Sequence, residues 1–319
     1  MEKKASFGAY TEYWLQTVVQ GTVKPNTYTV YRGLAKNHLL PSFGETPLKA
    51  LDRKKMQLFS RRLRDEKGLS VKTVRMTMNL LSQILRSAAE EGETEGNPCM
   101  HIRLPAAEER EAEAFSRAEQ RKIEEAAVRS QDGRALGVLL CLYTGIRLGE
   151  LCALKWENVN FALRAIEIKS TLCRVTLYGG GPRRTQLRED SPKTRNSARV
   201  IPLPLFLFRL LKKKSAETKS GYVICMKTGE RVQPRTMQLV YGRLLREAGV
   251  PYKKFHALRH TFATRAVEIG VDVKTISDIL GHCNAQITLN RYAHSLLEHK
   301  RHMMKNFDKL FEKAARPRD

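Results

Sequence analysis

The sequence has 319 residues and carries 57 lysine and arginine side chains against 33 aspartate and glutamate side chains, a formal net charge of +24. A hydrophobic content of 42% is enough for a buried core, which excludes wholesale disorder, and the length suggests about two domains. No apolar stretch reaches the ~20 residues of a membrane helix, and the N-terminus lacks the apolar segment of a secretory signal. The excess positive charge predicts a polyanionic partner, with nucleic acid ahead of an anionic membrane surface.

The cysteines predict a reduced chain. None of the six forms a CxxC pair. Cys141 and Cys152 lie in apolar, helix-like segments and are predicted to be small buried hydrophobes. A cytoplasmic protein with free thiols follows from this pattern.

Residues 6–90 show the 3.6-residue periodicity of amphipathic helices. Phe59 and Leu63, for example, fall on one helix face. Ser70 is a predicted N-cap for a helix that starts at Val71. The segment is therefore predicted to be a compact bundle of four or five helices.

A break in composition separates this bundle from the rest of the chain. Glycines and prolines interrupt residues 92–105, and a solvated charge run covers residues 108–113. Ser116 and Glu119 then form a capping-box pattern that opens the next helix. We therefore predict an N-terminal domain over residues 1–95, a linker over 96–112 and a second domain over 113–319.

The second domain is predicted to combine helices with short strands. Helices are expected over residues 136–143, 148–154, 236–248, 256–269, 273–280 and, as an amphipathic C-terminal helix, 303–311. Strands are expected over residues 165–171, 174–178 and 199–203. The predicted fold class is mainly α with a small β-sheet (α+β), in which the first domain is all-helical.

Six candidate functional residues follow one another in the second domain. They lie in the segments TGIRLGEL, SPKTRNSARVIPL, HALRHTFAT, ILGH and NRYAH, and they are Arg147, Lys193, His256, Arg259, His282 and Tyr292. Singly, each is typical of a surface charge, a structural histidine or a core tyrosine, but the ordered combination is specific. Together they resemble the tyrosine recombinase (phage integrase) family. The strand-rich insertion before Lys193 is most similar to integrases of conjugative transposons and related mobile elements.

Cleavage of a phosphodiester without a metal requires a nucleophile, an acid for the leaving group and positive donors for the non-bridging oxygens. Two guanidinium groups can hold a phosphate from two sides, which suits Arg147 and Arg259. His256 precedes Arg259 by three residues on one predicted helix, so these side chains share a face. Lys193, in a turn, can protonate the leaving 5′ oxygen, and Tyr292 can attack phosphorus.

The resemblance implies these roles and adds two. In the family, two arginines and two histidines bind the phosphate, a lysine is the general acid, and a tyrosine forms a 3′-phosphotyrosyl intermediate. His282 is thereby assigned to the phosphate, and Glu150 matches an acidic position that supports the active site. Because the intermediate retains the phosphodiester energy, strands rejoin without ATP, metal or other cofactor. The implied activity is site-specific DNA recombination that integrates or excises a mobile element.

A metal site is the alternative for the histidines. His256 and His260 are four residues apart, as in metal-binding helices, and His282, Cys283 and His294 follow. The segment HALRH lacks the glutamate of a zinc hydrolase and contains an arginine, which disfavours a bound cation. We therefore predict that no metal is bound.

Basic residues in both domains are candidates for contact with double-stranded DNA. They are Lys72, Thr73 and Arg75 at a helix start, and Arg183, Arg184 and Arg195 in the strand-rich insertion, whose alternative is a solvated hairpin. In the family, the two domains form a C-shaped clamp around the duplex. The resemblance also implies a homotetramer on paired DNA sites, DNA-bending or excision proteins as accessory partners, and a location at the nucleoid.

The two ends of the chain leave alternatives open. The helix over residues 303–311 either packs on its own domain or swaps into a neighbouring copy. Residues 1–5 are too few for the arm-binding domain of many mobile-element integrases. The protein therefore either acts on simple sites or is a fragment of a longer integrase.

There are three alternative functions, of which the DNA-binding regulator is unsupported because the nucleophile and both arginines are present. A Xer-type resolvase of chromosome or plasmid dimers shares the chemistry, although the strand-rich insertion argues mildly against it. A type IB topoisomerase would relax supercoils without strand exchange, and a DNA-binding regulator would form no phosphotyrosine. Covalent capture of DNA separates the regulator from the enzymes, and its site preference separates the topoisomerase from the recombinases.

Overall fold

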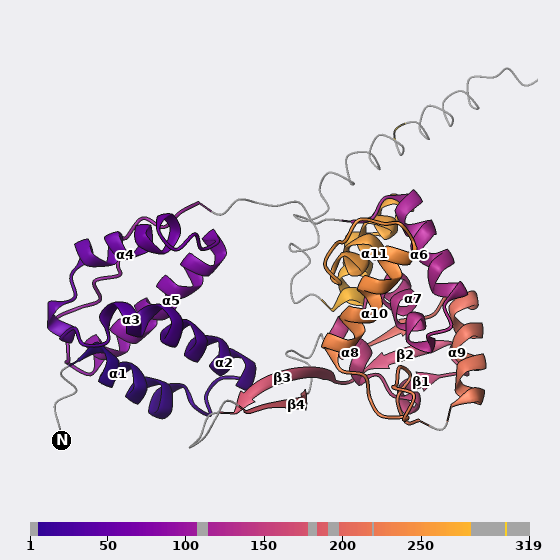
Figure 1. Cartoon of the computed structure of the whole chain (residues 1–319), viewed down its shortest axis with the longest axis horizontal. Helices are drawn as coiled ribbons and strands as arrows, with labels where there is room; N and C mark the ends of the chain where they lie inside the picture. Colours follow the sequence, from indigo (N-terminus) through magenta and orange to yellow (C-terminus); the bar gives the residue numbers. More distant parts are fainter. Residues whose placement is uncertain are drawn as a thin grey trace, which may run out of the picture. The chain divides into compact units, whose positions relative to one another are not determined.

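The computed structural model describes residues 6–106, 114–177, 184–190, 198–218 and 220–281, together with Met304 (Figure 1). At residues 176, 177 and 184 it describes the backbone only. The chain divides into two compact units, one formed by residues 1–110 with 174–186 and the other by residues 111–173 with 187–319. No helix in the described ranges is long and apolar enough to cross a membrane.

The first unit is a helical bundle. Its elements are α1 (Phe7–Tyr13), η1 (Trp14–Val19), α2 (Pro25–Leu34), η2 (Ala35–Leu39), α3 (Leu40–Phe43), η3 (Leu48–Ala50), α4 (Arg53–Asp65) and α5 (Val71–Glu90). Side chains of Ser6, Asp52 and Ser70 cap α1, α4 and α5 and satisfy amide groups that have no partner within the helix. The predicted N-cap at Ser70 is confirmed. The apolar helix faces enclose one core that contains Phe7, Tyr10 and Leu81.

The segment after α5 packs on the same bundle. Cys99 is buried in the core, and Ile102 and Leu104 lie against it. The side-chain amide of Gln57 makes two hydrogen bonds of 2.9 Å with the backbone of Arg103, one in each direction. The first part of the predicted linker is therefore held by the first unit, because its apolar side chains can join the core.

The second unit combines helices with a small sheet (Figure 1). Its helical elements are α6 (Arg117–Arg129), η4 (Gly133–Ala135), α7 (Leu136–Thr144), α8 (Leu148–Ala153), η5 (Trp156–Asn158), α9 (Leu205–Glu217), α10 (Pro234–Glu247), α11 (Ala257–Glu268) and α12 (Val273–Leu280). The predicted C-terminal helix lies outside the described residues except for Met304, which is helical.

Three short strands form the sheet of this unit. Strands β1 (Val159–Asn160), β2 (Ala165–Ile168) and β5 (Arg199–Pro202) pair antiparallel in the order β1-β2-β5. The register places Ile168 opposite Arg199 at one end of β5. Strands β3 (Thr171–Leu177) and β4 (Arg184–Asp190) pair with each other in a separate two-stranded sheet. The predicted fold class, mainly α with a small β-sheet, is confirmed.

Helix α7 is buried along most of its length in the core of the second unit. Val138, Leu140 and Leu142 are all inaccessible, as expected for a helix that is apolar on every side. The predicted burial of Cys141 and Cys152 is confirmed, and burial raises the pKa of the Cys152 thiol to about 12. Helix α7 packs against α11, so it supports both the loop that leads into α8 and the start of α11.

The start of α6 has the capping box that the sequence predicts. The backbone amide of Glu119 donates to Ser116 Oγ at 3.1 Å, and the amide of Ser116 donates to Glu119 Oε2 at 2.7 Å. Lys253 Nζ lies 3.0 Å from Glu119 Oε2 and 4.8 Å from the centroid of the Phe115 ring. These contacts tie the beginning of the second unit to the loop that precedes α11.

Candidate active site

The turn between α7 and α8 carries the first arginine of the predicted site. Gly145 ends α7 with a φ of +65°, and a Cβ atom at this position would lie 2.6 Å from Leu280 Cδ2 and 2.7 Å from Phe262 Cδ1. A residue with a side chain is therefore disfavoured both by the left-handed conformation and by these contacts. Arg147 follows in extended conformation as the N-cap of α8. Its side chain is 37% exposed, so part of its guanidinium is accessible to a ligand.

Glu150 is the centre of a buried charge cluster. Its Oε1 accepts hydrogen bonds from Arg147 Nη1 at 2.7 Å and Arg199 Nη1 at 3.1 Å. Its Oε2 accepts from the Arg147 backbone amide at 2.9 Å and from Arg199 Nη2 at 2.8 Å. The side chain is 5% exposed, so water contributes little, and both oxygens are fully used by two arginines.

The surroundings of Glu150 keep it ionised. Burial by itself raises the pKa of the carboxyl, because it penalises the charged form. The hydrogen bonds and charge of Arg199, together with the amide and charge of Arg147, outweigh burial and hold the pKa of Glu150 below its usual range. The carboxylate therefore stays charged at neutral pH and can orient both arginines.

Arg259 is the second arginine of the predicted site and lies on α11. Its side chain is 3% exposed. Nη1 donates to the carbonyl of Gly145 at 2.8 Å, and Nη2 donates to the carbonyl of Leu280 at 2.7 Å. The guanidinium thus bridges the C-terminal ends of α7 and α12, where carbonyl groups favour a positive charge.

The two histidines of the HALRH segment lie at the start of α11. His256 is the exposed N-cap residue, and its ring packs edge-on against His260, with ring centroids 4.6 Å apart. Among the residues that the structure describes, no three His, Cys, Asp or Glu side chains converge to hold a metal ion. His256 is one residue before the helix that carries Arg259, so the backbone places both side chains at the same end of α11.

The C-terminus of α12 gathers three arginines. Three successive carbonyls accept one hydrogen bond each: Ile279 from Arg199 Nε at 2.5 Å, Leu280 from Arg259 Nη2 at 2.7 Å and Gly281 from Arg147 Nη2 at 3.1 Å. Carbonyls at a helix end have no partner within the helix, and the helix dipole makes this end negative. Three guanidinium groups therefore meet at one helix terminus, directly before His282 in the sequence.

Sequence reasoning missed Arg199. It lies 49 positions after Glu150, at the start of a strand in the RVIPL segment, where an arginine before an apolar run is typical of a strand end. One chemical signal could have indicated it: a buried carboxylate has room for more hydrogen bonds than one arginine supplies, so a second cationic side chain is expected beside it. The identity of that cation depends on the pairing of β5 with β2, which is a long-range feature.

Several predicted site residues lie outside the described part of the chain. They are Lys193, His282, Tyr292, Arg183 and Arg195, and for Arg184 the backbone alone is described, in β4. The structure therefore brings Arg147, Glu150 and Arg259 together. The roles of Lys193 as the acid and Tyr292 as the nucleophile stay predictions.

The predicted DNA contacts of the first unit lie at the start of α5. Lys72 and Arg75 are exposed, and Arg75 Nη1 donates to the carbonyl of Pro105 at 3.2 Å. Thr73 is half-buried, and its hydroxyl lies 2.9 Å from Ser70 Oγ at the helix cap. Lys72 and Arg75 thus have the accessibility that a phosphate contact needs, whereas Thr73 is engaged in capping.

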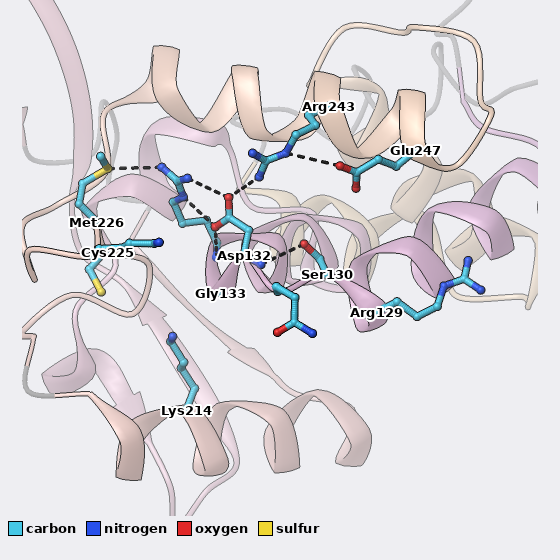
Figure 2. Close-up of a pocket in the computed structure, with 12 residues that line it drawn as sticks. Arg129, Ser130, Asp132, Gly133, Lys214, Cys225, Met226, Arg243 and Glu247 are labelled. Atoms are coloured by element: carbon cyan, nitrogen blue, oxygen red, sulfur yellow. Dashed lines mark hydrogen bonds and ion pairs between the residues drawn. The ribbon is translucent and has the colours of Figure 1, made fainter.

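A cleft of about 670 Å³ elsewhere in the second unit holds a second carboxylate hub (Figure 2). Arg134 Nη2 donates to Asp132 Oδ2 at 2.8 Å, and Arg243 also pairs with this oxygen. Arg134 Nη1 lies 3.5 Å from Met226 Sδ. Because this cleft shares no residue with the arginine cluster, we do not place the active site there.

Comparison with known proteins follows the two-unit division of the chain. The profile of the phage integrase family matches residues 106–299, and the profile of the phage integrase N-terminal SAM-like domain matches residues 6–63. A tyrosine recombinase XerC-like protein of Caldanaerobacter subterraneus subsp. tengcongensis is 33% identical, over 96% of this chain and 83% of that protein. The ICEBs1 integrase of Bacillus subtilis is 26% identical, over 90% and 78% of the two chains.

Solved structures share the fold. The integrase of transposon Tn1549 in complex with a circular intermediate DNA superposes with a TM-score of 0.79 at 22% identity, over 95% of this chain and 99% of that one. A lambda integrase tetramer bound to a Holliday junction gives a TM-score of 0.70 at 20% identity, over 89% and 79%. With a family profile across more than half of its length and a relative at 33% identity along nearly all of it, the chain belongs to the phage integrase family and is a tyrosine-type site-specific DNA recombinase.

Proposed function

We propose that this recombinase integrates or excises a mobile element by cutting and rejoining DNA at the arginine cluster around the α12 C-terminus. The observation that supports this site is the convergence of Arg147 and Arg259, each held by backbone carbonyls. Three arginines and one glutamate give the described cluster a net charge of +2. Such a charge suits a phosphodiester, whose negative charge increases in the transition state.

The proposed reaction assigns one role to each residue. The Tyr292 hydroxyl releases its proton to solvent as Oη attacks phosphorus, the bond to the 5′ oxygen breaks, and Lys193 gives a proton to that oxygen and is reprotonated from solvent. Arg147 and Arg259, with His256 and the sequence-assigned His282, bind the non-bridging oxygens. The product is a 3′-phosphotyrosyl enzyme and a free 5′ hydroxyl. Attack by another 5′ hydroxyl reverses the step and joins the new strands without metal, ATP or cofactor.

The rest of the chain would hold the DNA. We assign DNA-core binding to residues 1–95, connection to 96–112 and catalysis to 113–319. In this arrangement Lys72 and Arg75 contact phosphates, and residues of the β3–β4 region add a second contact. The lambda integrase relative is a tetramer on a Holliday junction, which supports a tetramer on paired sites for this chain. A protein that works on such sites resides at the nucleoid.

A Xer-type resolvase is the second candidate function. The observation that favours it is the 33% identity with the XerC-like protein. The ICEBs1 integrase and the transposases of Tn916 and Tn1545 favour the mobile-element function. Both candidate functions use the same active site and the same chemistry, so they differ only in the DNA sequence at which the enzyme cleaves.

Covalent trapping on nicked DNA tests the proposal. Duplexes are made from the ends of the element that carries this chain and from a chromosomal dimer-resolution site, each nicked so that cleavage cannot reverse. A protein–DNA adduct on denaturing gels is expected with the element ends and absent with Tyr292→Phe. An adduct on the chromosomal site alone would favour the resolvase, and an adduct that persists in Tyr292→Phe would overturn the nucleophile assignment.

A further inference from the structure

Arg199 is a buried arginine that the reaction above does not use. Its side chain is 6% exposed and forms a forked pair with Glu150, with Nη1 on Oε1 and Nη2 on Oε2. Its Nε donates to the carbonyl of Ile279 at the end of α12. The planar fork of a guanidinium fits a carboxylate better than any other side chain. These contacts commit the guanidinium of Arg199 to protein groups, and its pairing with the Glu150 carboxylate through both terminal nitrogens distinguishes it from Arg259, which bonds to backbone carbonyls.

The charge of Arg199 matters for Arg147. Glu150 lies 2.7 Å from Arg147 Nη1, and a lone carboxylate at this distance would neutralise the guanidinium that a phosphate needs. Such pairing is strong in a buried site, because little water screens it. Arg199 gives the carboxylate a second cation, which is more deeply buried than Arg147. With Arg199 present, the three side chains carry a net positive charge, and without it they carry none.

The geometry of Arg199 matters for both phosphate-binding arginines. Arg199, Arg259 and Arg147 hold three successive carbonyls of the same helix end. Release of Ile279 would loosen the turn that Leu280 and Gly281 form, and these two residues are the anchors of Arg259 and Arg147. A change at Arg199 therefore reaches both arginines through the backbone of α12.

We propose that Arg199 is a positioning residue for strand cleavage, which balances Glu150 and anchors the α12 C-terminus so that Arg147 and Arg259 keep the charge and placement that a scissile phosphate requires. This inference rests on the proposed function, because it assumes that both arginines bind the phosphate. It differs from a purely structural role in one respect: the removal of Glu150 should compensate for the removal of Arg199.

The test uses the full chain and the nicked duplex described above. The rate constant of adduct formation at saturating protein and the non-covalent DNA affinity are measured for Arg199→Gln, Arg199→Lys, Glu150→Gln and the double variant of Arg199→Gln with Glu150→Gln. Arg134→Gln is the matched control, since Arg134 also makes two hydrogen bonds to one carboxylate, from Nε and Nη2 to Asp132, in the separate cleft. Wild-type protein in the same gel tests the proposed function by itself.

We expect Arg199→Gln to slow adduct formation by about 10- to 100-fold, the usual cost of losing a partner that orients a site, with unchanged DNA affinity. Arg199→Lys keeps the charge but not the forked geometry, so it should slow adduct formation less than Arg199→Gln does. It also provides the test if Arg199→Gln does not fold. The double variant should cleave faster than Arg199→Gln alone, and Arg134→Gln at the wild-type rate.

Three outcomes would overturn the inference. They are wild-type cleavage by a folded Arg199→Gln, a double variant whose loss is the product of the two single losses, and an equal loss in Arg134→Gln. Absence of an adduct with wild-type protein would instead refute the proposed function, so the two failures are distinguishable.

Discussion

At the scale of the residue, a single carboxylate organises the candidate site. The family resemblance implied that Glu150, three positions after Arg147, supports the active site. That Arg147 and Arg259 lie at one site was likewise implied by the family resemblance. Arg199 could not be identified at all, since its contact with Glu150 depends on the pairing of two strands and on the end of α12. The family pattern therefore indicated part of the cluster, and tertiary packing supplied the rest.

Glu150→Gln should lower the free energy of unfolding of the second unit by about 3 kcal/mol or more at neutral pH, the cost of breaking a buried pair. The folded-state pKa of Glu150 lies below its unfolded value of about 4.3, so this contribution is complete above that value. It is lost as the pH falls through the folded-state pKa. The stability difference between wild type and Glu150→Gln should therefore be constant above about pH 4.3 and shrink as the pH falls below that value.

Denaturant unfolding followed by Trp156 fluorescence in a Trp14→Phe background measures this effect, because each unit holds one of the two tryptophans. Glu125→Gln is the control, since Glu125 is exposed and pairs with Arg121 on the surface of α6. Its change should stay below about 1 kcal/mol. A stability difference between Glu150→Gln and wild type that does not shrink below about pH 4.3 would contradict the role of the charge.

At the scale of the element, the sequence predicts helix starts better than helix interiors. The caps at Ser70 and Ser116 were predicted because they depend on neighbouring residues alone. The π-helical turns η1 and η2, which continue α1 and α2, leave no such local pattern. The packing of Cys99 and Ile102 on the first unit was also missed, because glycines, prolines and charges around them are typical of a connector.

Gly145→Ala should destabilise the second unit through the junction of α7, α11 and α12. The left-handed conformation alone costs an alanine about 1 kcal/mol, and the overlap of its Cβ with Leu280 and Phe262 should add about 1–3 kcal/mol. Gly249→Ala is the matched control, because Gly249 has a φ of +61° and nothing within 4 Å of the added Cβ. Equal losses in the two variants, measured by denaturant unfolding, would show that packing at Gly145 contributes nothing.

At the scale of the whole molecule, the order of the functional residues along the chain carried more information than any element. Arg147 caps α8, whereas His256 and Arg259 lie at the start of α11, and only the ordered combination with the other three residues specified the family. The order of these residues does not decide between mobile-element integration and dimer resolution, because relatives of both kinds match most of the chain. That choice depends on the DNA sequence read by exposed side chains, which one chain's sequence and fold do not specify.

The net charge of +24 should make DNA binding strongly dependent on salt. Each phosphate contact that is lost reduces the slope of log affinity against log salt by about 0.9, because one fewer counterion is released. Lys72 is exposed at the start of α5, so Lys72→Gln should weaken binding to all duplexes alike and reduce the slope by about 1. Lys72→Arg keeps the charge and should leave the slope unchanged. Fluorescence anisotropy over a series of salt concentrations measures both variants, and a wild-type slope for Lys72→Gln would place Lys72 away from the DNA backbone.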